Sequence, residues 1–160
     1  MKRIKGICLI LISILWASCT DHIVYHSYHH FPKEGWAKSD TILLDLHITD
    51  SVASNAEITF LIRNKTNYPY QDFSAMLLHN MPDSTNWRNY NLNFVLADKD
   101  GRWSGSGWGG LYQSSVSLGN VYVAPGTYTF KVIHQMQDEQ LTGVNDIGIL
   151  IEKELFTTEK

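Results

Sequence analysis

Apolar side chains recur at every second position through much of this chain, and this alternation restricts the fold more than any other feature of the sequence. It is clearest after Pro125-Gly126, where one face of an expected strand carries Tyr128, Phe130, Val132, His134 and Met136. A period of two is that of a β-strand with one buried face, whereas an amphipathic helix repeats every 3.6 residues. The sequence carries no long amphipathic helical pattern after its N-terminal segment, so we expect an all-β protein.

Other segments repeat the same pattern between turn signals, and they lie at residues 42–48, 58–62, 73–78, 90–96 and 147–151. We expect the first two to pair with each other. Asp98-Lys99-Asp100-Gly101 predicts a hairpin turn, with residues 102–118 as its return arm. About seven or eight strands in one domain indicate an antiparallel β-sandwich. Its centre should hold Phe60, Phe94 and Phe130.

The N-terminus has the pattern of a lipoprotein signal peptide. Basic residues among the first five positions precede an apolar run at residues 7–16, and the small residues Ala17 and Ser18 come just before Cys19. The run is shorter than the roughly 20 apolar residues that span a bilayer. We therefore expect residues 1–18 to be removed and Cys19 to carry the lipid. The other cysteine, Cys8, leaves with the signal, so the mature chain has no disulfide.

Charge and composition narrow the classes of partner. The chain has 13 Lys and Arg against 16 Asp and Glu, and three of the basic residues but none of the acidic ones fall in the signal segment. A mature domain with this acidic balance is a poor ligand for nucleic acid or anionic lipid. Residues 19–38 show neither hydrophobic period, so we interpret them as an extended lead from the lipid into a β-sandwich domain at residues 39–157.

A glycine-rich segment at residues 105–110 matches the spacing G-x-G-x-x-G. A dinucleotide site needs this motif between a strand and a helix, and the residues that follow do not favour a helix. Glycines in a strand more often mark a bulge or a close approach of another backbone. The neighbouring Trp103, Trp108 and Tyr112 could stack on a sugar or a partner, or could cover the core.

The histidines His22, His26, His29 and His30 lie close together in the lead. Metal ligands can be spaced in this way, but a zinc site needs ligands held in fixed geometry, so we expect no metal. The sequence also lacks a nucleophile elbow, an H-E-x-x-H helix and a free catalytic cysteine. We therefore expect neither enzymatic activity nor a cofactor.

Several segments, taken in order, resemble the GldH-type gliding-motility lipoproteins of the Bacteroidota. They are Cys19; residues 28–32 with Trp36; residues 67–70; residues 100–103 with Gly105; residues 126–130 and 134–136; and residues 141–149 with residues 151–153. The resemblance implies a lipid-anchored component of the cell envelope, associated with gliding and type IX secretion and without catalysis. The sequence departs from it at Gln137, where an arginine is expected.

The resemblance sets the expectations for location, partners and modification. The location is expected to be the outer membrane, with an envelope protein partner contacted through Trp103, Trp108, Gly109 and Tyr112; a glycan ligand for the same aromatics is the alternative. Asp50-Ser51-Val52 resembles the short tripeptides that Bacteroidota O-glycosylate, and Ser51 lies in the turn expected to be the most exposed. Asp40-Thr41-Ile42 and Asp83-Ser84-Thr85 match the same pattern.

Overall fold

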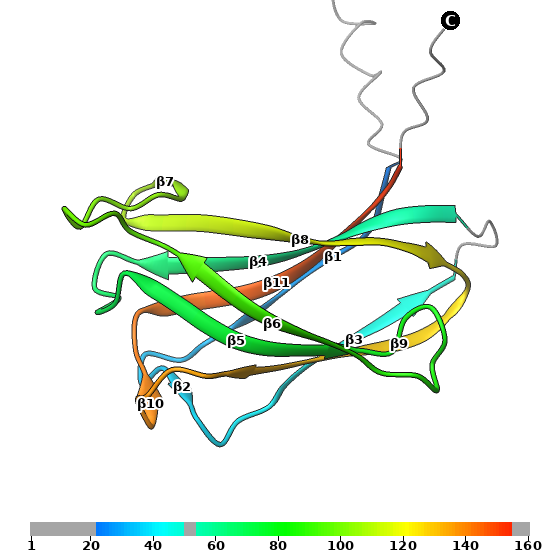
Figure 1. The fold of residues 1–160 in the computed structure, drawn as a ribbon, viewed down its shortest axis with the longest axis horizontal. Coiled ribbons are helices and arrows are strands. Elements are labelled where there is room, and N and C mark those ends of the chain that lie inside the picture. The colour runs from blue at the N-terminus through cyan, green and yellow to red at the C-terminus, as the bar shows by residue number, and fades with distance from the viewer. Residues whose placement is uncertain (1–21, 50–53, 155–160) are drawn as a thin grey trace, which may run out of the picture.

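Two antiparallel sheets pack face to face in the computed structural model, which describes residues 22–49 and 54–154 (Figure 1). One sheet has the strand order β1-β11-β4-β8-β7, the other has the order β3-β9-β5-β6, and β2 pairs with β10. The strands are β1 (Ile23–His30), β2 (Trp36–Ala37), β3 (Ile42–Ile48), β4 (Ser54–Lys65), β5 (Asp72–His79), β6 (Arg88–Val95), β7 (Ser106–Trp108), β8 (Leu111–Val123), β9 (Gly126–His134), β10 (Gln140–Leu141) and β11 (Val144–Lys153). The expected all-β sandwich is confirmed.

The core lies between the sheets and follows the alternation of the sequence. Along β3, the residues Ile42, Leu44, Leu46 and Ile48 are buried and the residues between them are exposed. Phe60 and Phe130 are completely buried, Phe94 is nearly so, and the rings of Phe60 and Phe94 lie 5.8 Å apart across the two sheets. The three phenylalanines expected at the centre are therefore in the core.

Two expectations about strand pairing were wrong. β3 and β4 do not pair, because β3 pairs with β9 in one sheet while β4 lies between β8 and β11 in the other. The return arm after the turn pairs only briefly, through a bridge between Ala97 and Trp103 and a bond from Ser104 N–H to Leu96 O. The chain then crosses to the other sheet. Alternation identifies a strand but not the sheet that it joins, so these errors share one cause.

The assignment of residues 19–38 to an extended lead also needs correction. Residues 23–30 form the edge strand β1, which pairs with β11 in register from Tyr25 opposite Ile151 to His30 opposite Asp146. Trp36 is buried in the core, and its ring stacks on Phe31 at 4.7 Å. Both faces of β1 carry His and Tyr, so the strand shows little hydrophobic contrast in the sequence.

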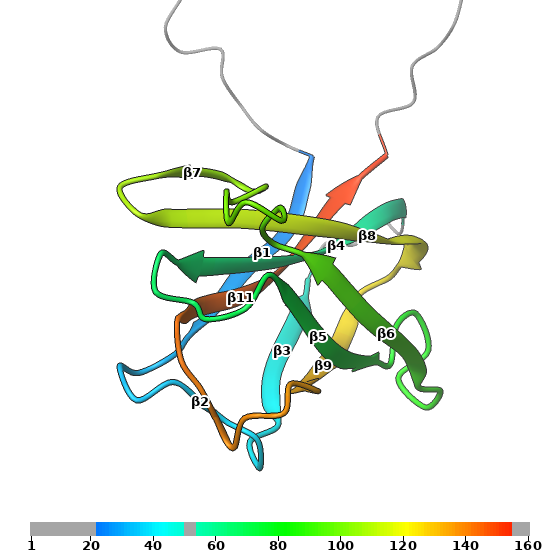
Figure 2. The same cartoon turned by 60° about the vertical axis from the view of Figure 1, so that its left-hand side comes forward.

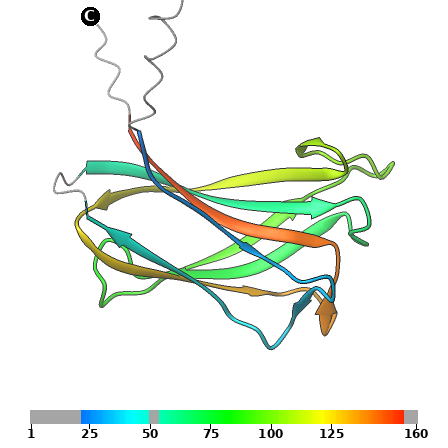
Figure 3. The ribbon, with the colours of Figure 1, turned by 180° about the vertical axis from the view of Figure 1, so that it is seen from behind.

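The two ends of the described chain lie side by side at one end of the sandwich (Figure 3), where Lys153 N–H donates to His22 O over 2.7 Å. The β7–β8 hairpin lies at the opposite end (Figure 1). Along one side the sheets close, because β1 lies against β3 and the Tyr25 hydroxyl donates to Asp45 O over 3.3 Å. Along the other side β6 and β8 diverge (Figures 1 and 2).

In the part of the chain that the structure describes, no helix is long and apolar enough to cross a membrane.

Candidate interaction surface

The β7–β8 hairpin projects one tryptophan into solvent. Its two-residue turn is Gly109-Gly110, with φ of +64° and +85°, a pair of left-handed conformations that glycine adopts without strain. Trp108 immediately precedes the turn and its side chain is 93% exposed. A tryptophan with so little contact contributes almost nothing to folding, so its exposure calls for a functional explanation.

Gly105 and Gly107 allow β7 to reach β8 closely. A Cβ on Gly105 would lie 2.5 Å from Gln113 O, and one on Gly107 would lie 2.4 Å from Leu111 O. No side chain fits at such distances. The glycine-rich segment is therefore a close backbone approach within a hairpin, as its strand context predicted, and no helix follows it.

Trp103 and Tyr112 point away from Trp108. Residues directly opposite each other in paired strands share a face, so Trp108 lies with Leu111 on the outer face while Tyr112 lies with Gly107 on the inner one. The Trp103 ring is 5.8 Å from that of Tyr112 and 6.4 Å from that of Tyr68. Burial raises the pKa of the Tyr68 hydroxyl well above its ordinary value. The three candidate aromatics thus divide into a packed pair, Trp103 and Tyr112, and one exposed ring, Trp108.

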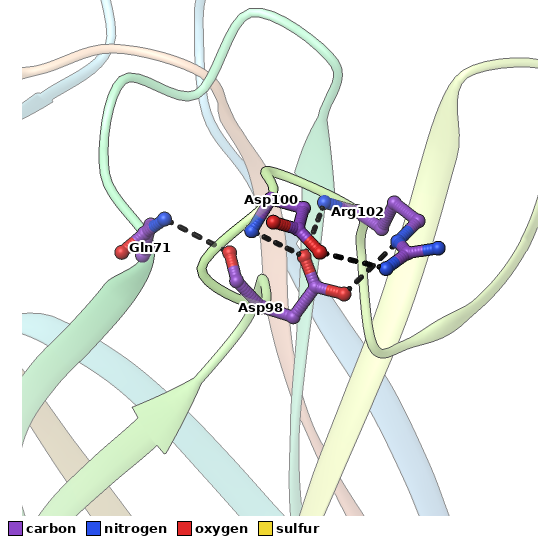
Figure 4. A network of polar contacts seen from close by, with 4 residues as sticks. All are labelled: Gln71, Asp98, Asp100 and Arg102. Atoms are coloured by element: carbon purple, nitrogen blue, oxygen red, sulfur yellow. Dashed lines mark hydrogen bonds and ion pairs between the residues drawn. The ribbon is translucent and has the colours of Figure 1, made fainter.

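A polar network fixes the turn from which the chain crosses between the sheets (Figure 4). The Asp98 carboxylate accepts bonds from the backbone N–H groups of Arg102 and Asp100, both at 2.9 Å, and these bonds lower its pKa. The Arg102 guanidinium bridges Asp98 at 3.1 Å and Asp100 at 2.8 Å, and Gln71 donates to Asp98 O. The turn expected at these residues is present, and Gly101 takes a φ of +79° in it.

A second cluster, which the sequence did not reveal, lies on the outer face of the five-stranded sheet. Asp146 is fully buried there, and both of its oxygens accept bonds from Arg63, over 2.5 and 2.7 Å. The nitrogen Nδ1 of His30 lies 3.0 Å from the same carboxylate. The Arg63 guanidinium stacks 4.0 Å above the ring of Tyr28, whose hydroxyl donates to Gln113 over 3.0 Å.

Gly148 makes this cluster possible. The Tyr28 ring crosses over it, and a Cβ at that position would lie 2.6 Å from the ring. The bond to Asp146 raises the pKa of Arg63, and burial raises that of Tyr28. A glycine within a strand and a charged residue inside an apolar run were the available signals in the sequence. Neither signal shows which residue it contacts, since Tyr28 and Arg63 are far from Asp146 and Gly148 in the sequence.

The remaining candidates are distributed as follows. The histidines are spread along β1 and beside it: His22 lies 3.4 Å from Glu152, His26 contacts the Tyr28 ring, and His29 contacts Phe31. Cys19 and Ser51 lie outside the described residues.

Comparison with known protein families identifies the chain's relatives. A sequence model of the family described as GldH lipoprotein matches residues 23–151, which is most of the chain and begins at the first residue of β1. No curated protein matches the chain at a significant level.

Proposed function

Because this chain belongs to the GldH lipoprotein family, we propose that it is a lipid-anchored, non-catalytic component of an envelope assembly that serves gliding and type IX secretion. The lipid is attached at Cys19, and the membrane is the outer membrane. The domain binds another envelope protein, and the Trp108 hairpin is the contact.

The position of Trp108 is the observation that carries this proposal. The chain that leads from a lipid on Cys19 enters the domain at His22, and the hairpin lies at the other end of the same sheet (Figure 1). Along β4, Ala56 lies opposite Lys153 near the chain ends, and Lys65 lies opposite Leu111 at the hairpin. This part of β4 corresponds to about 30 Å of extended strand. The hairpin therefore faces away from the anchored end. Exposed tryptophans of this kind supply the central anchors of protein interfaces.

Replacing Trp108 tests the proposal in the native host. Trp108→Ala should remove the partner from the purified complex and leave the free energy of unfolding within about 0.5 kcal/mol, because the side chain is exposed. Trp87→Ala is the matched control, since Trp87 is the other tryptophan with substantial exposure among residues 22–49 and 54–154 and packs on Lys131 away from the hairpin. A folded Trp108→Ala protein that retains every partner would refute the proposal.

Gly109 provides an independent test of the hairpin. Gly109→Val places a branched side chain at a φ of +64° and should disturb the turn, whereas Gly109→Asn is tolerated there. Partner binding should fall for the valine variant and persist for the asparagine variant. Equal binding by the two folded variants would show that the shape of the turn does not matter.

A glycan is the second candidate ligand, and one feature favours it. Beside the turn lies a polar groove of about 410 Å³ that is lined by Lys65, Thr66, Asn67, Gly109, Gly110, Leu111 and Asn145. An exposed aromatic ring beside amide and ammonium groups can hold a sugar. The platform is reduced to Trp108, because Trp103 and Tyr112 pack inward. Binding on a glycan array that Trp108→Ala abolishes, without any protein partner, would favour this function.

A further inference from the structure

The edge strand β8 is only partly covered. It runs for 13 residues and pairs with β4 along its length, but β7 covers the other edge only at residues 111–113. Across residues 22–49 and 54–154, no strand pairs with the edge of β8 at residues 115–123. A long stretch of unpaired backbone N–H and C=O groups is a template for another strand.

The hairpin register shows which backbone groups face this edge. Trp108 and Leu111 flank a two-residue turn and therefore exchange hydrogen bonds with each other. Because the bonding direction alternates along an antiparallel strand, the N–H and C=O groups of Ser115 and Ser117 point to the free edge, and those of Val116 point to β4.

A groove lies between the end of β6 and the beginning of β8, next to Ser115 and Val116 at one end of this edge. Its volume is about 490 Å³, and it is lined by Asn93, Phe94, Val95, Ser104, Gly105, Ser106, Gln113, Ser114, Ser115 and Val116. Val95 is 73% exposed and Val116 is 37% exposed. Val95 faces outward from β6 opposite Asp72, whereas Phe94 and Val116 lie on the inner faces of their strands. A strand added to β8 would place every second side chain on the inner face beside Val116, and the others in solvent beside Ser115 and Ser117.

The absence of charged residues along β8 and most of β6 indicates what kind of strand this edge can bind. Residues 89–97 and 103–130 contain no Asp, Glu, Lys or Arg, although 18% of the chain is charged. Edge strands are ordinarily protected by lysine, proline or short length, and β8 has none of these along residues 115–123. The edge and groove therefore suit a neutral strand that alternates apolar with small polar residues.

A second copy of the chain fits less well than a different polypeptide. The register of β8 shifts between Ser117 and Gly119, where Gly119 has a φ of +93°, so a bulge lies near the middle of the free edge. Two copies related by a twofold axis at the middle of this edge would set one bulge against the other and lose the pairing there. A different strand can pair with the regular part of the edge alone.

We propose that the free edge of β8 at residues 115–123 binds an extended, neutral segment of a partner polypeptide by strand addition, with its apolar side chains in the groove between β6 and β8. The inference rests on the proposed function, because it takes the ligand of the domain to be another protein. It uses a surface separate from the tip of the Trp108 hairpin.

The test measures amide hydrogen exchange in the full-length protein with a defined probe. The probe is a capped peptide of roughly eight residues, the usual length of a strand, that alternates Val with Ser and Thr. Exchange at Ser115 and Ser117 should slow at least about tenfold on saturation, because these amides gain a partner. The same peptide with N-methyl groups at alternate residues should bind at least about tenfold more weakly.

A matched pair of variants tests the same edge from the side of the protein. Ser115→Pro removes an N–H that faces outward and spares the bonds to β4, so the protein should fold and its affinity for the peptide should fall by about tenfold. Ser115→Ala keeps the N–H and should bind within about twofold of the parent. If Ser115→Pro does not fold, the N-methylated peptide decides the question alone.

Three results would overturn the inference: no slowing at Ser115 and Ser117, equal binding of the two peptides, or slowing that grows with protein concentration without peptide, which would indicate a second copy. Failure here is distinct from failure of the proposed function. A Trp108→Ala protein that loses its partner while the peptide leaves exchange unchanged refutes strand addition only.

Discussion

At the scale of single residues, the outer face of the five-stranded sheet depends on one buried carboxylate. Asp146 has no exposed surface and is neutralised by Arg63, while His30 and Asn145 lie within hydrogen-bond distance. A carboxylate buried in this way is tolerated only while its partners remain. The cluster joins β1, β11 and β4, so it fastens the edge strand nearest the chain entry to the sheet.

Removing the cation from this cluster should destabilise the fold strongly. Arg63→Leu leaves the Asp146 carboxylate buried without its ion pair, and we expect a loss of about 3 kcal/mol in the free energy of unfolding. Chemical denaturation at neutral pH measures this. The double variant Arg63→Leu, Asp146→Leu is the control, since it leaves no unpaired charge and should be more stable than the single variant. If the double variant is the less stable one, the ion pair does not have this role.

His79 makes stability dependent on pH. Burial, and then the charge of Arg88, lower its pKa to about 4, and its Nε2 has no hydrogen-bond partner among the described residues. The ring is neutral in the fold, whereas an unfolded histidine has a pKa near 6.5. Stability is therefore complete above about pH 6.5 and is lost as the pH falls toward 4.

The expected loss from His79 is about 2 kcal/mol between pH 7 and pH 5. His79→Phe removes the titrating group, and its free energy of unfolding should fall by about 2 kcal/mol less over the same interval. Denaturation at the two pH values gives both slopes. Identical slopes for the parent and the variant would show that His79 does not titrate differently on unfolding.

At the scale of elements, the sequence contained the strands but not their neighbours. The period of two located β3, β4, β5, β6, β9 and β11, because a half-buried strand must alternate. It missed β1, whose faces carry similar polar and aromatic residues, and it could not show that β3 and β4 join different sheets. Strand order depends on long-range packing, which a local pattern does not record.

The candidate site shows the same limit. Trp108 and the neighbouring glycines were identifiable from the sequence, but residues 102–118 were expected to form one return arm, so the turn at Gly109-Gly110 was missed. The separation of Trp108 from Trp103 and Tyr112 was not identifiable, because it depends on how the chain crosses between the sheets after Ser104.

Strand β9 allows the core assignment to be tested. Phe130 is fully buried, and its ring lies 5.1 Å from that of His79. Phe130→Ala should cost about 3–5 kcal/mol in the free energy of unfolding. Leu43→Ala on neighbouring β3 is the control, because Leu43 is 54% exposed and should cost less than about 1 kcal/mol. Similar losses for the two variants would contradict the burial of this face.

At the scale of the whole molecule, the chain entry from the proposed anchor and the proposed contact surface lie at opposite ends of the sandwich. His22 and Lys153 lie together at one end of the sandwich, and the glycine-rich hairpin lies at the other. Both the hairpin and the free edge of β8 are formed by the same crossing of the chain from β6 into β7. The hairpin presents an exposed, uncharged surface away from the proposed anchor, whereas the free edge of β8 runs back toward the chain entry, where Val121 lies opposite Ala56.

The anchor can be tested directly at Cys19. Cys19→Ser removes the thiol that would carry the lipid, so the variant should remain unprocessed and lose its acylated N-terminal peptide in mass spectrometry of the membrane fraction. Processing and membrane association equal to those of the parent would refute the anchor. The folded domain should be unaffected, which denaturation of the purified variant checks.

Photo-crosslinking in living cells of the native host tests the central claim most directly. A photoreactive phenylalanine analogue replaces Trp108 at the hairpin or, as the control, Leu43 on the exposed face of β3. The account predicts one dominant adduct with an envelope protein from position 108 and no such adduct from position 43. Adducts that are absent at position 108, or identical at the two positions, would contradict the claim that this hairpin contacts a partner.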